Sequence, residues 1–377
     1  MIYFDNAATT FPKPPAVIRE MTKCMREWGG NPGRSGHPLA LSAAEAIYSV
    51  RVELAEFFDM EKAENIVFTQ NCTHALNLVI AGIARYGDHF LISNLEHNSV
   101  LRTVDNLCRV RGMTYDMFDA LQSDDALLCE IDGKIRPRTK AVIATHASNI
   151  CPRRLPIREI GALCRARDLL YVVDAAQSAG IYDISMKRDG ISALCAPGHK
   201  GLYGPQGSGF AAFADDFDFE RFFGSIYGGN GRNSAERDLG HEAPDSFEAG
   251  TVATPCIVGL GAGVRFVKSL TRARIEESEH MLYRHAKRIL NDIQGAYLYM
   301  PEAENGSLLL LGFHDIAPSD VAERLGSLGI CTRAGMHCAP TAPAALGTGG
   351  DALRISFSAM NTLDEVTRFM HVLGSVI

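Results

Sequence analysis

The sequence has no hydrophobic run long enough to cross a bilayer, and no basic region followed by an apolar core at its N-terminus. It also has no long basic run, and its formal net charge is −7. These absences argue against a membrane or a nucleic acid as the main partner. We therefore expect a cytoplasmic protein whose partner is a small molecule.

Motifs for metal binding and for disulfide frameworks are missing as well. The ten cysteines are scattered over 377 residues without a C-x-x-C pair, and neither H-E-x-x-H nor a zinc-like Cys/His spacing occurs. Low-complexity tracts and short repeats are also absent. We expect a folded chain without a metal, with mostly reduced and buried thiols, and the length predicts roughly two to three domains.

What the sequence does contain is an alternation of short apolar strands with helices. Near-continuous apolar strands of this kind predict an α/β fold with a mostly parallel sheet covered by helices on both faces. The predicted strands are 65–69, 90–93, 141–145 and 169–173, and the helices after the first three are 75–84, 100–111 and 157–168. After residue 255 two long helices and three strands predict a smaller α+β unit. We predict a large domain of residues 15–255 and a small domain of 256–377 with 1–14.

Polar residues follow each predicted strand: Thr73, His97, Asn149, Asp174 and Gln177. Ligands bind outside the carboxyl ends of such strands, so these side chains should converge. Thr73 could bind a phosphate together with helix N–H groups, or simply cap a helix. Asp174 could face a cation such as a protonated pyridine nitrogen, or cap the next helix. The other three could contact a ligand or stabilise the core and turns.

The stretch 196–209 places Lys200 among five glycines and two prolines. It lies between a predicted helix and an apolar run that begins at Phe210. A lysine in such a tight turn could be partly desolvated, with a lowered pKa that favours Schiff-base chemistry, or it could be an ordinary solvated lysine. The glycine order does not match a dinucleotide-binding loop.

A second constellation lies near the C-terminus. Cys338 stands on a loop with Arg333 and His337 close in sequence, where a depressed thiol pKa would favour a nucleophile over inert packing. Arg354 offers a planar fork for a substrate carboxylate, or for a structural salt bridge.

Taken together, these motifs resemble the class V, fold type I enzymes that use pyridoxal phosphate, in particular the cysteine desulfurase and selenocysteine lyase family. The likeness runs through nearly the full chain, and the segment around Cys338 resembles the Suf-type branch. The motifs that carry it, in order, are Phe4-Asp5-Asn6-Ala7-Ala8, the turn at Thr73, Glu96-His97-Asn98, Ser148-Asn149, Asp174-Ala175-Ala176-Gln177, Gly198-His199-Lys200, Gly250-Thr251, Arg333 to Cys338, Arg354-Ile355-Ser356 and Asn361-Thr362.

The resemblance implies a role for each matching residue. Lys200 would form the Schiff base with pyridoxal 5'-phosphate and later move the Cα proton, while Cys338 would take the substrate sulfur as a persulfide and leave alanine. The remaining implied roles are stacking on the ring by His97, pairing with the pyridine nitrogen by Asp174, contacts to the ring oxygen by Asn149 and Gln177, phosphate binding by Thr73 and His199, and substrate binding by Arg354 with Arg333 and Asn149.

The resemblance also implies partners. Thr251 would reach the phosphate of a neighbouring subunit, which predicts a homodimer with shared active sites. The substrate would be L-cysteine or L-selenocysteine, a sulfur-acceptor protein would be a further partner, and the pathway would belong to sulfur metabolism such as iron–sulfur cluster assembly.

Two departures from the family pattern keep alternatives open. Pro197 stands where Ser or Thr is usual, which predicts lower cofactor affinity, and Cys151-Pro152 replaces a turn of small residues. The second departure leaves open an aminotransferase or epimerase acting on another amino acid. The first leaves open an interaction protein that has lost turnover.

Overall fold

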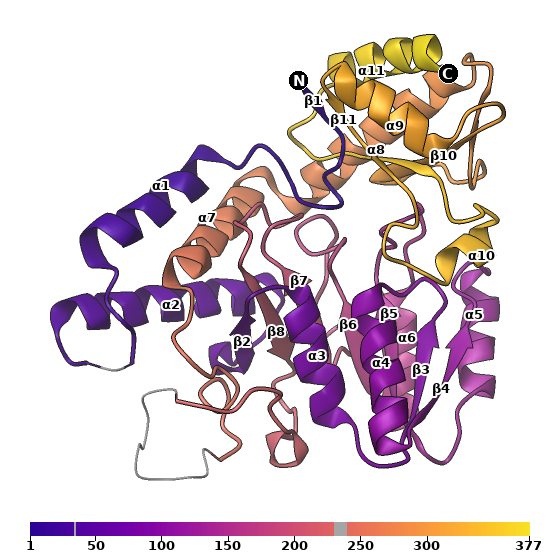
Figure 1. The fold of residues 1–377 in the computed structure, drawn as a ribbon. Coiled ribbons are helices and arrows are strands. Elements are labelled where there is room, and N and C mark those ends of the chain that lie inside the picture. Colours follow the sequence, from indigo (N-terminus) through magenta and orange to yellow (C-terminus); the bar gives the residue numbers. More distant parts are fainter. Residues whose placement is uncertain (34, 230–239) are drawn as a thin grey trace.

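Seven strands form the central sheet of the computed structural model, which describes residues 1–33, 35–229 and 240–377. Their order in the sheet is β2-β8-β7-β6-β5-β3-β4, and β8 alone runs antiparallel to its neighbours (Figure 1). The predicted mostly parallel α/β sheet is therefore confirmed. The strands are β2 (Ile66–Thr69), β3 (His89–Ser93), β4 (Thr114–Phe118), β5 (Thr139–Thr145), β6 (Leu170–Asp174), β7 (Ala193–Pro197) and β8 (Gly209–Phe213).

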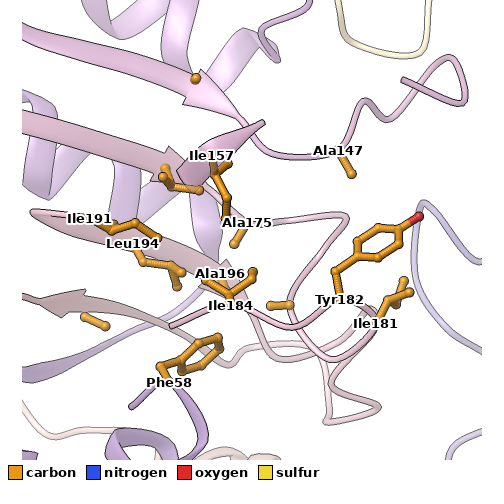
Figure 2. Close-up of a cluster of buried hydrophobic side chains, with 14 of the residues drawn as sticks. Phe58, Ala147, Ile157, Ala175, Ile181, Tyr182, Ile184, Ile191, Leu194 and Ala196 are labelled. Atoms are coloured by element: carbon orange, nitrogen blue, oxygen red, sulfur yellow. The ribbon is translucent and has the colours of Figure 1, made fainter. Parts of the chain in front are cut away.

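Helices cover both faces of this sheet, because successive strand residues point to opposite sides. In β6, Tyr171 and Val173 pack into one buried cluster and Val172 into the other. The cluster of Val172 is completed by α3 (Cys72–Ile83) and α4 (Asn98–Arg111). The opposite cluster, part of which Figure 2 shows around Phe58 and Leu194, is completed by α2 (Pro38–Phe57), α5 (Asp124–Gly133), α6 (Ile157–Ala166) and α7 (Thr254–Leu270).

One local prediction is wrong. The segment before the Lys200 turn is not a helix but strand β7, which pairs in parallel with β6 and antiparallel with β8. All five of its residues are buried. Lys200 therefore follows a central strand of the sheet, in the position where ligand-binding groups of α/β folds are found.

A second layer of structure lies above the carboxyl ends of the large sheet (Figure 1). It contains an antiparallel sheet of order β12-β13-β10-β9 and the parallel pair β1-β11. The elements are β1 (Ile2–Tyr3), α8 (Arg272–Leu290), β9 (Ala296–Leu298), β10 (Leu308–Phe313), α9 (Pro318–Ser327), β11 (Ile330–Cys331), β12 (Arg333–Ala334), α10 (Ala342–Leu346), β13 (Leu353–Ser356) and α11 (Leu363–Val376).

The N-terminal segment packs against the C-terminal part of the chain. Ile2 and Phe4 pack in the core of the small sheet, together with Phe369 of α11. Helix α7, which begins at Thr254, packs instead with α1 (Pro15–Lys23) and α2 of the large unit. The division at residue 255 remains a prediction, and the described helices include none long and apolar enough to cross a membrane.

Candidate active site

The carboxyl ends of the strands open onto a cavity of about 220 Å³. Ten of the eleven site residues predicted from the sequence line it: Thr73, His97, Asn149, Asp174, Gln177, His199, Lys200, Arg333, Cys338 and Arg354. They come from both units of the chain and from segments more than 280 positions apart. The large sheet thus brings its strand-end side chains to one edge, as predicted, and Arg333, Cys338 and Arg354 reach the same cavity from the small unit.

Asp174 and Lys200 bring a buried carboxylate and a half-buried amine to this cavity. Asp174 is the last residue of β6 and is 2% exposed. Its Oδ1 accepts a hydrogen bond from the Ala176 N–H at 2.8 Å and lies 3.6 Å from the Cys72 Sγ, which donates to it. Burial lowers the pKa of Lys200, and the Asp174 carboxylate opposes that shift. A larger share of this amine is therefore unprotonated than in an exposed lysine, so more of it is available to act as a nucleophile or a general base.

The turn that carries Lys200 is fixed by the N-terminal segment. Thr10 Oγ1 donates to the Lys200 carbonyl at 2.9 Å, and Lys13 Nζ donates to the His199 carbonyl at 2.8 Å. Within the turn, a Cβ added to Gly198 would lie 2.1 Å from Ser208 Oγ, so the close approach requires glycine. The backbone of Lys200 is held in place, and only its side chain is free to act.

Pro197 costs the sheet no hydrogen bond. It ends β7 opposite Gly209, and the next residue, Gly198, donates its N–H to Ser208 O at 2.8 Å. Because the N–H groups of a strand alternate in direction, position 197 faces the β6 side. There β6 ends at Asp174, whose partner in β7 is Cys195. Proline therefore sits where no strand partner is lost.

One end of the cavity carries donors suited to an anion. Helix α3 begins beside it, and its cap is Asn71, which accepts from the His74 N–H. The reading of Thr73 as the cap is therefore wrong: Thr73 stands inside the first turn, its Oγ1 2.7 Å from Ser99 Oγ. The N–H groups of a first helical turn have no partner within the helix. They favour an anion together with the helix dipole.

His199 lines this cavity and carries a buried nitrogen without a partner among the described residues. Its buried Nδ1 has no hydrogen-bond partner among the described residues. Burial, with smaller effects from Lys200 and Lys13, lowers the pKa of His199 to about 4, so the ring is neutral at neutral pH. A neutral imidazole with one unused nitrogen needs a ligand atom to satisfy it. This orphaned atom fits a phosphate-bearing ligand bound in the cavity.

The ring of His97 is held in one tautomer. Its Nδ1 accepts a hydrogen bond from the Ser99 N–H at 3.0 Å as the cap of α4. Burial lowers the pKa of His97, so the neutral ring predominates and its proton lies on Nε2. The ring lines the cavity with a fixed orientation, which suits a ligand-stacking surface.

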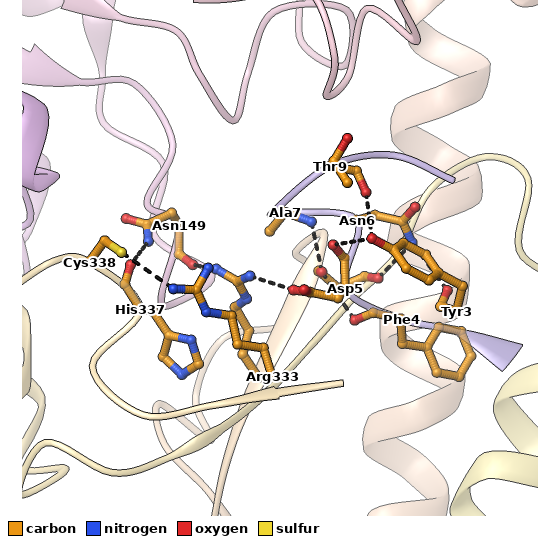
Figure 3. Close-up of polar contacts among 12 residues, drawn as sticks. Tyr3, Phe4, Asp5, Asn6, Ala7, Thr9, Asn149, Arg333, His337 and Cys338 are labelled. Carbon is orange, nitrogen blue, oxygen red and sulfur yellow. Dashed lines mark hydrogen bonds and ion pairs between the residues drawn. The ribbon is translucent and has the colours of Figure 1, made fainter. Parts of the chain in front are cut away.

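Two amide side chains connect the cavity to other segments. Gln177 Nε2 donates to the carbonyl of Ala7 at 2.9 Å, and Asn149 Nδ2 donates to the carbonyl of His337 at 2.5 Å. Figure 3 shows Asn149 facing the His337 carbonyl. Both amides therefore stabilise the packing of loops at the cavity, which was the alternative left open by the sequence. Each also lines the cavity.

Cys338 stands on a loop with an unusual backbone. His337 and Cys338 have φ angles of 51° and 61°, which non-glycine residues rarely adopt. The loop is held by the Asn98 N–H, which donates to the Cys338 carbonyl at 2.8 Å. Arg333 Nη2 lies 3.3 Å from Cys338 Sγ (Figure 3). This contact gives the sulfur a positively charged neighbour within hydrogen-bonding distance.

Arg354 forms the structural salt bridge that was one of the two roles left open by the sequence, and it also lines the cavity. It is 1% exposed, and its Nη2 forms an ion pair with Asp5 Oδ1 at 2.7 Å. Its Nη1 donates to the Asn149 carbonyl at 2.7 Å, while its buried Nε has no partner among the described residues. The salt bridge is thus present, and the guanidinium still borders the cavity.

Several lining residues were missed by the sequence analysis, namely Ala7, Ala8, Asn71, Cys72, Leu76, Ser99, Thr145, Ala176, Pro197 as a lining residue, and His337. Cys72, Ala176 and His337 adjoin predicted site residues, and Ala7 and Ala8 stand in a motif that carries the family resemblance. Thr251 lies outside the cavity: it is exposed, and its Oγ1 accepts a hydrogen bond from Asn31 Nδ2 at 3.3 Å.

A smaller cavity of about 40 Å³ shares Gln177 and Lys200 with the first, and its lining also includes Cys151, Pro152 and Glu279. Glu279 of α8 is 2% exposed, and its Oε2 has no partner among the described residues. Burial raises the pKa of Glu279 to about 8, although the hydrogen bond from Ser307 opposes the shift. The carboxyl group is therefore protonated at neutral pH.

This burial predicts a pH-dependent stability. The folded state binds the Glu279 proton more tightly than the unfolded state, so this stabilisation is complete below the unfolded pKa and is lost as pH rises toward about 8. In the unmodified protein, we expect the unfolding free energy to fall by up to about 1.4 kcal/mol per pH unit as pH rises toward about 8. This fall should be absent from Glu279→Gln. Urea unfolding at about pH 6 and about pH 8 measures it. Glu277→Gln, an exposed neighbour, is the control; equal slopes for Glu279→Gln and the unmodified protein would contradict the prediction.

The fold and the cavity define an α/β protein with a half-buried lysine and a buried carboxylate at the carboxyl edge of its sheet. The model of the family described as aminotransferase class V matches residues 2–369, and the chain belongs to this family. It is 31% identical over 370 residues to a probable cysteine desulfurase of Methanothermobacter thermautotrophicus, covering 97% of this chain and 92% of that protein. It is 30% identical to one of Pyrococcus abyssi, covering 100% and 94%.

Solved structures agree with this assignment. The apo structure of the cysteine desulfurase of Thermococcus onnurineus superposes with a TM-score of 0.91 at 31% identity, covering 100% of this chain and 94% of that chain. The cysteine desulfurase CsdA of Escherichia coli superposes with a TM-score of 0.89 over 99% and 94% of the two chains. At 24% identity, that second likeness bears on the fold alone.

Proposed function

We propose that this protein is a cysteine desulfurase that uses pyridoxal 5'-phosphate. The observation that carries the proposal is that Lys200, Asp174 and Cys338 line one cavity, so that an amine, a carboxylate and a thiol meet there. The full-length relatives named probable cysteine desulfurases support it.

The donor set of the cavity fits this cofactor. The first turn of α3, Thr73 and the unpartnered Nδ1 of His199 would hold the phosphate. Asp174 would face the pyridine nitrogen, and His97 would stack on the ring. Asn149 and Gln177 would lie at the ring oxygen. When bound, pyridoxal phosphate would supply an electron-withdrawing ring that stabilises negative charge at the substrate Cα.

The protein groups would then divide the remaining work. The Lys200 amine would take and return the proton at the substrate Cα, a task that its lowered pKa favours. Arg354, with Arg333 and Asn149, would hold the substrate carboxylate. Cys338 would attack the substrate sulfur as a thiolate: an S–S bond forms on Cys338, the substrate C–S bond breaks, and a proton completes the methyl group of alanine. The products, alanine and a persulfide, balance without an oxidant.

Assembly and pathway belong to the same proposal. Thr251 is exposed and does not line the cavity of its own subunit. In a homodimer it would instead contact the cofactor phosphate bound in the cavity of the second subunit. An acceptor protein for the persulfide sulfur, a cytoplasmic location and a place in iron–sulfur cluster assembly follow from the family resemblance.

The test is incubation of the purified protein, supplied with pyridoxal phosphate, with L-cysteine, L-selenocysteine and cystine in parallel. We expect alanine to appear from cysteine or selenocysteine without any added keto acid. Transfer of the amino group only when a keto acid is present would instead favour an aminotransferase. Absence of any turnover together with absence of cofactor binding would favour an interaction protein.

A further inference from the structure

A second hollow adjoins the cavity and shares the nucleophilic thiol with it. This hollow, the α3/α4 groove, has a volume of about 500 Å³ and lies between the two helices that stand side by side in Figure 1. Four residues line both hollows: Thr73, His97, Ser99 and Cys338. Cys338 thus stands at the boundary between a buried cavity and an open groove.

The position of Cys338 at this boundary is fixed by the chain. Its carbonyl accepts from the N–H of Asn98, the first residue of α4, which itself lines the groove. The preceding carbonyl, that of His337, accepts from Asn149 on the cavity side. Cys338 therefore borders both hollows, so that a sulfur received from the cavity could be passed to a ligand in the groove.

The lining of the groove selects for an anion of small size. A volume of about 500 Å³ lies in the range of small-molecule sites. The described lining residues include no Asp or Glu, and the polar ones are amides and hydroxyls, with His97 and Arg102. Arg102 is exposed and has no hydrogen-bond or ion-pair partner among the described residues. A free guanidinium in a groove without carboxylates favours a ligand with its own carboxylate.

We propose that the α3/α4 groove binds a small thiol that carries a carboxylate, and that this thiol accepts the sulfur from Cys338. The inference rests on the proposed function for the persulfide. The thiolate of the acceptor attacks the outer sulfur, a new S–S bond forms, and the bond to Cys338 Sγ breaks. Sγ leaves with the electron pair, and the proton lost by the acceptor thiol is balanced by the one that Cys338 regains. No oxidant or reductant is required.

The experiment compares two thiols of similar size and different charge. One turnover with L-cysteine loads Cys338, the small molecules are removed, and 3-mercaptopropionate or 2-mercaptoethanol is added. Mass spectrometry of the Cys338 peptide follows the loss of the extra sulfur. We expect Arg102→Gln to slow the transfer to 3-mercaptopropionate at sub-saturating concentration by about fivefold, the size of an exposed charge pair. Transfer to 2-mercaptoethanol should stay unchanged, and Arg102→Lys should restore most of the loss.

Arg158→Gln is the control, because it removes one exposed positive charge from α6, outside the groove. Equal rates for Arg102→Gln and the unmodified protein with 3-mercaptopropionate overturn the inference. A second arm needs neither cofactor nor substrate: Cys338 is converted to a mixed disulfide with 2-thiopyridine and released by the same two thiols. In this arm, faster release by 3-mercaptopropionate than by 2-mercaptoethanol that depends on Arg102 would support thiol binding in the groove. If the same protein formed no alanine from cysteine, the result would count against the desulfurase function.

Discussion

Replacement of Lys200 by alanine should abolish covalent attachment of pyridoxal phosphate to the protein. Lys200 lies in the turn after β7, it lines the same cavity as Asp174, and burial lowers the pKa of its amine. An unprotonated amine is the form that condenses with an aldehyde. We expect borohydride reduction of the loaded protein to leave the cofactor on the peptide that contains Lys200, and on no peptide of the variant. Turnover of L-cysteine should fall by roughly 10³-fold or more.

Lys13 provides a demanding control for this experiment. Its Nζ donates to the carbonyl of His199, next to Lys200, and burial lowers the pKa of Lys13 to about 8. Lys13 is thus the other lysine near the turn with an amine that is easily deprotonated. Lys13→Ala should keep the label on Lys200. A label found on Lys13 of the unmodified protein, or one retained by Lys200→Ala, would show that the reactive lysine has been misassigned.

The convergence of the site was predictable because strand ends fix positions. Thr73, His97 and Asp174 each follow an apolar strand, and parallel strands place their carboxyl ends at one edge. Strands β3, β5 and β6 could be predicted because each is a near-continuous apolar run, as expected for a strand buried on both faces. The sequence therefore specified which side chains meet without specifying any distance between them.

The long-range contacts at the site had no local signal. Arg354 pairs with Asp5 across 349 positions, and Gln177 bonds to Ala7 across 170. Both contacts depend on the N-terminal segment, which pairs with β11 and then lines the cavity at Ala7 and Ala8. No spacing in the sequence encodes that path, because it follows from how two separate cores pack.

Strand β7 was misread for a different reason. This strand, Ala193–Pro197, has only five residues, most of them small, and it ends in proline. In so short an apolar segment, neither hydrophobic periodicity nor residue propensity distinguishes a strand from a helix. Pairing with β6 and β8 decides the conformation, and the proline is tolerated because β6 has ended beside it. The position of Lys200 at the sheet edge is therefore set by tertiary pairing and by the turn glycines together.

Replacement of Cys338 by alanine should abolish the desulfurase reaction while leaving the cofactor attached. Cys338 lines the cavity with Lys200, and Arg333 Nη2 lies 3.3 Å from its sulfur. Loss of the nucleophile removes the only step that takes sulfur from the substrate. We expect alanine release from L-cysteine to fall by roughly 10³-fold or more, as for other nucleophile deletions. Mass spectrometry after one turnover should find no added sulfur.

Cys129→Ala is the matched control, since Cys129 is an exposed thiol on α5 that lines neither the cavity nor the groove. It should retain full alanine release. Attachment of the cofactor to Lys200 should be equal in Cys338→Ala and the unmodified protein, which separates loss of the nucleophile from loss of the fold. Undiminished alanine release by Cys338→Ala would assign the sulfur chemistry to another group. Because Cys338 is the one thiol shared by the cavity and the α3/α4 groove, that result would also remove the link between desulfuration and sulfur transfer.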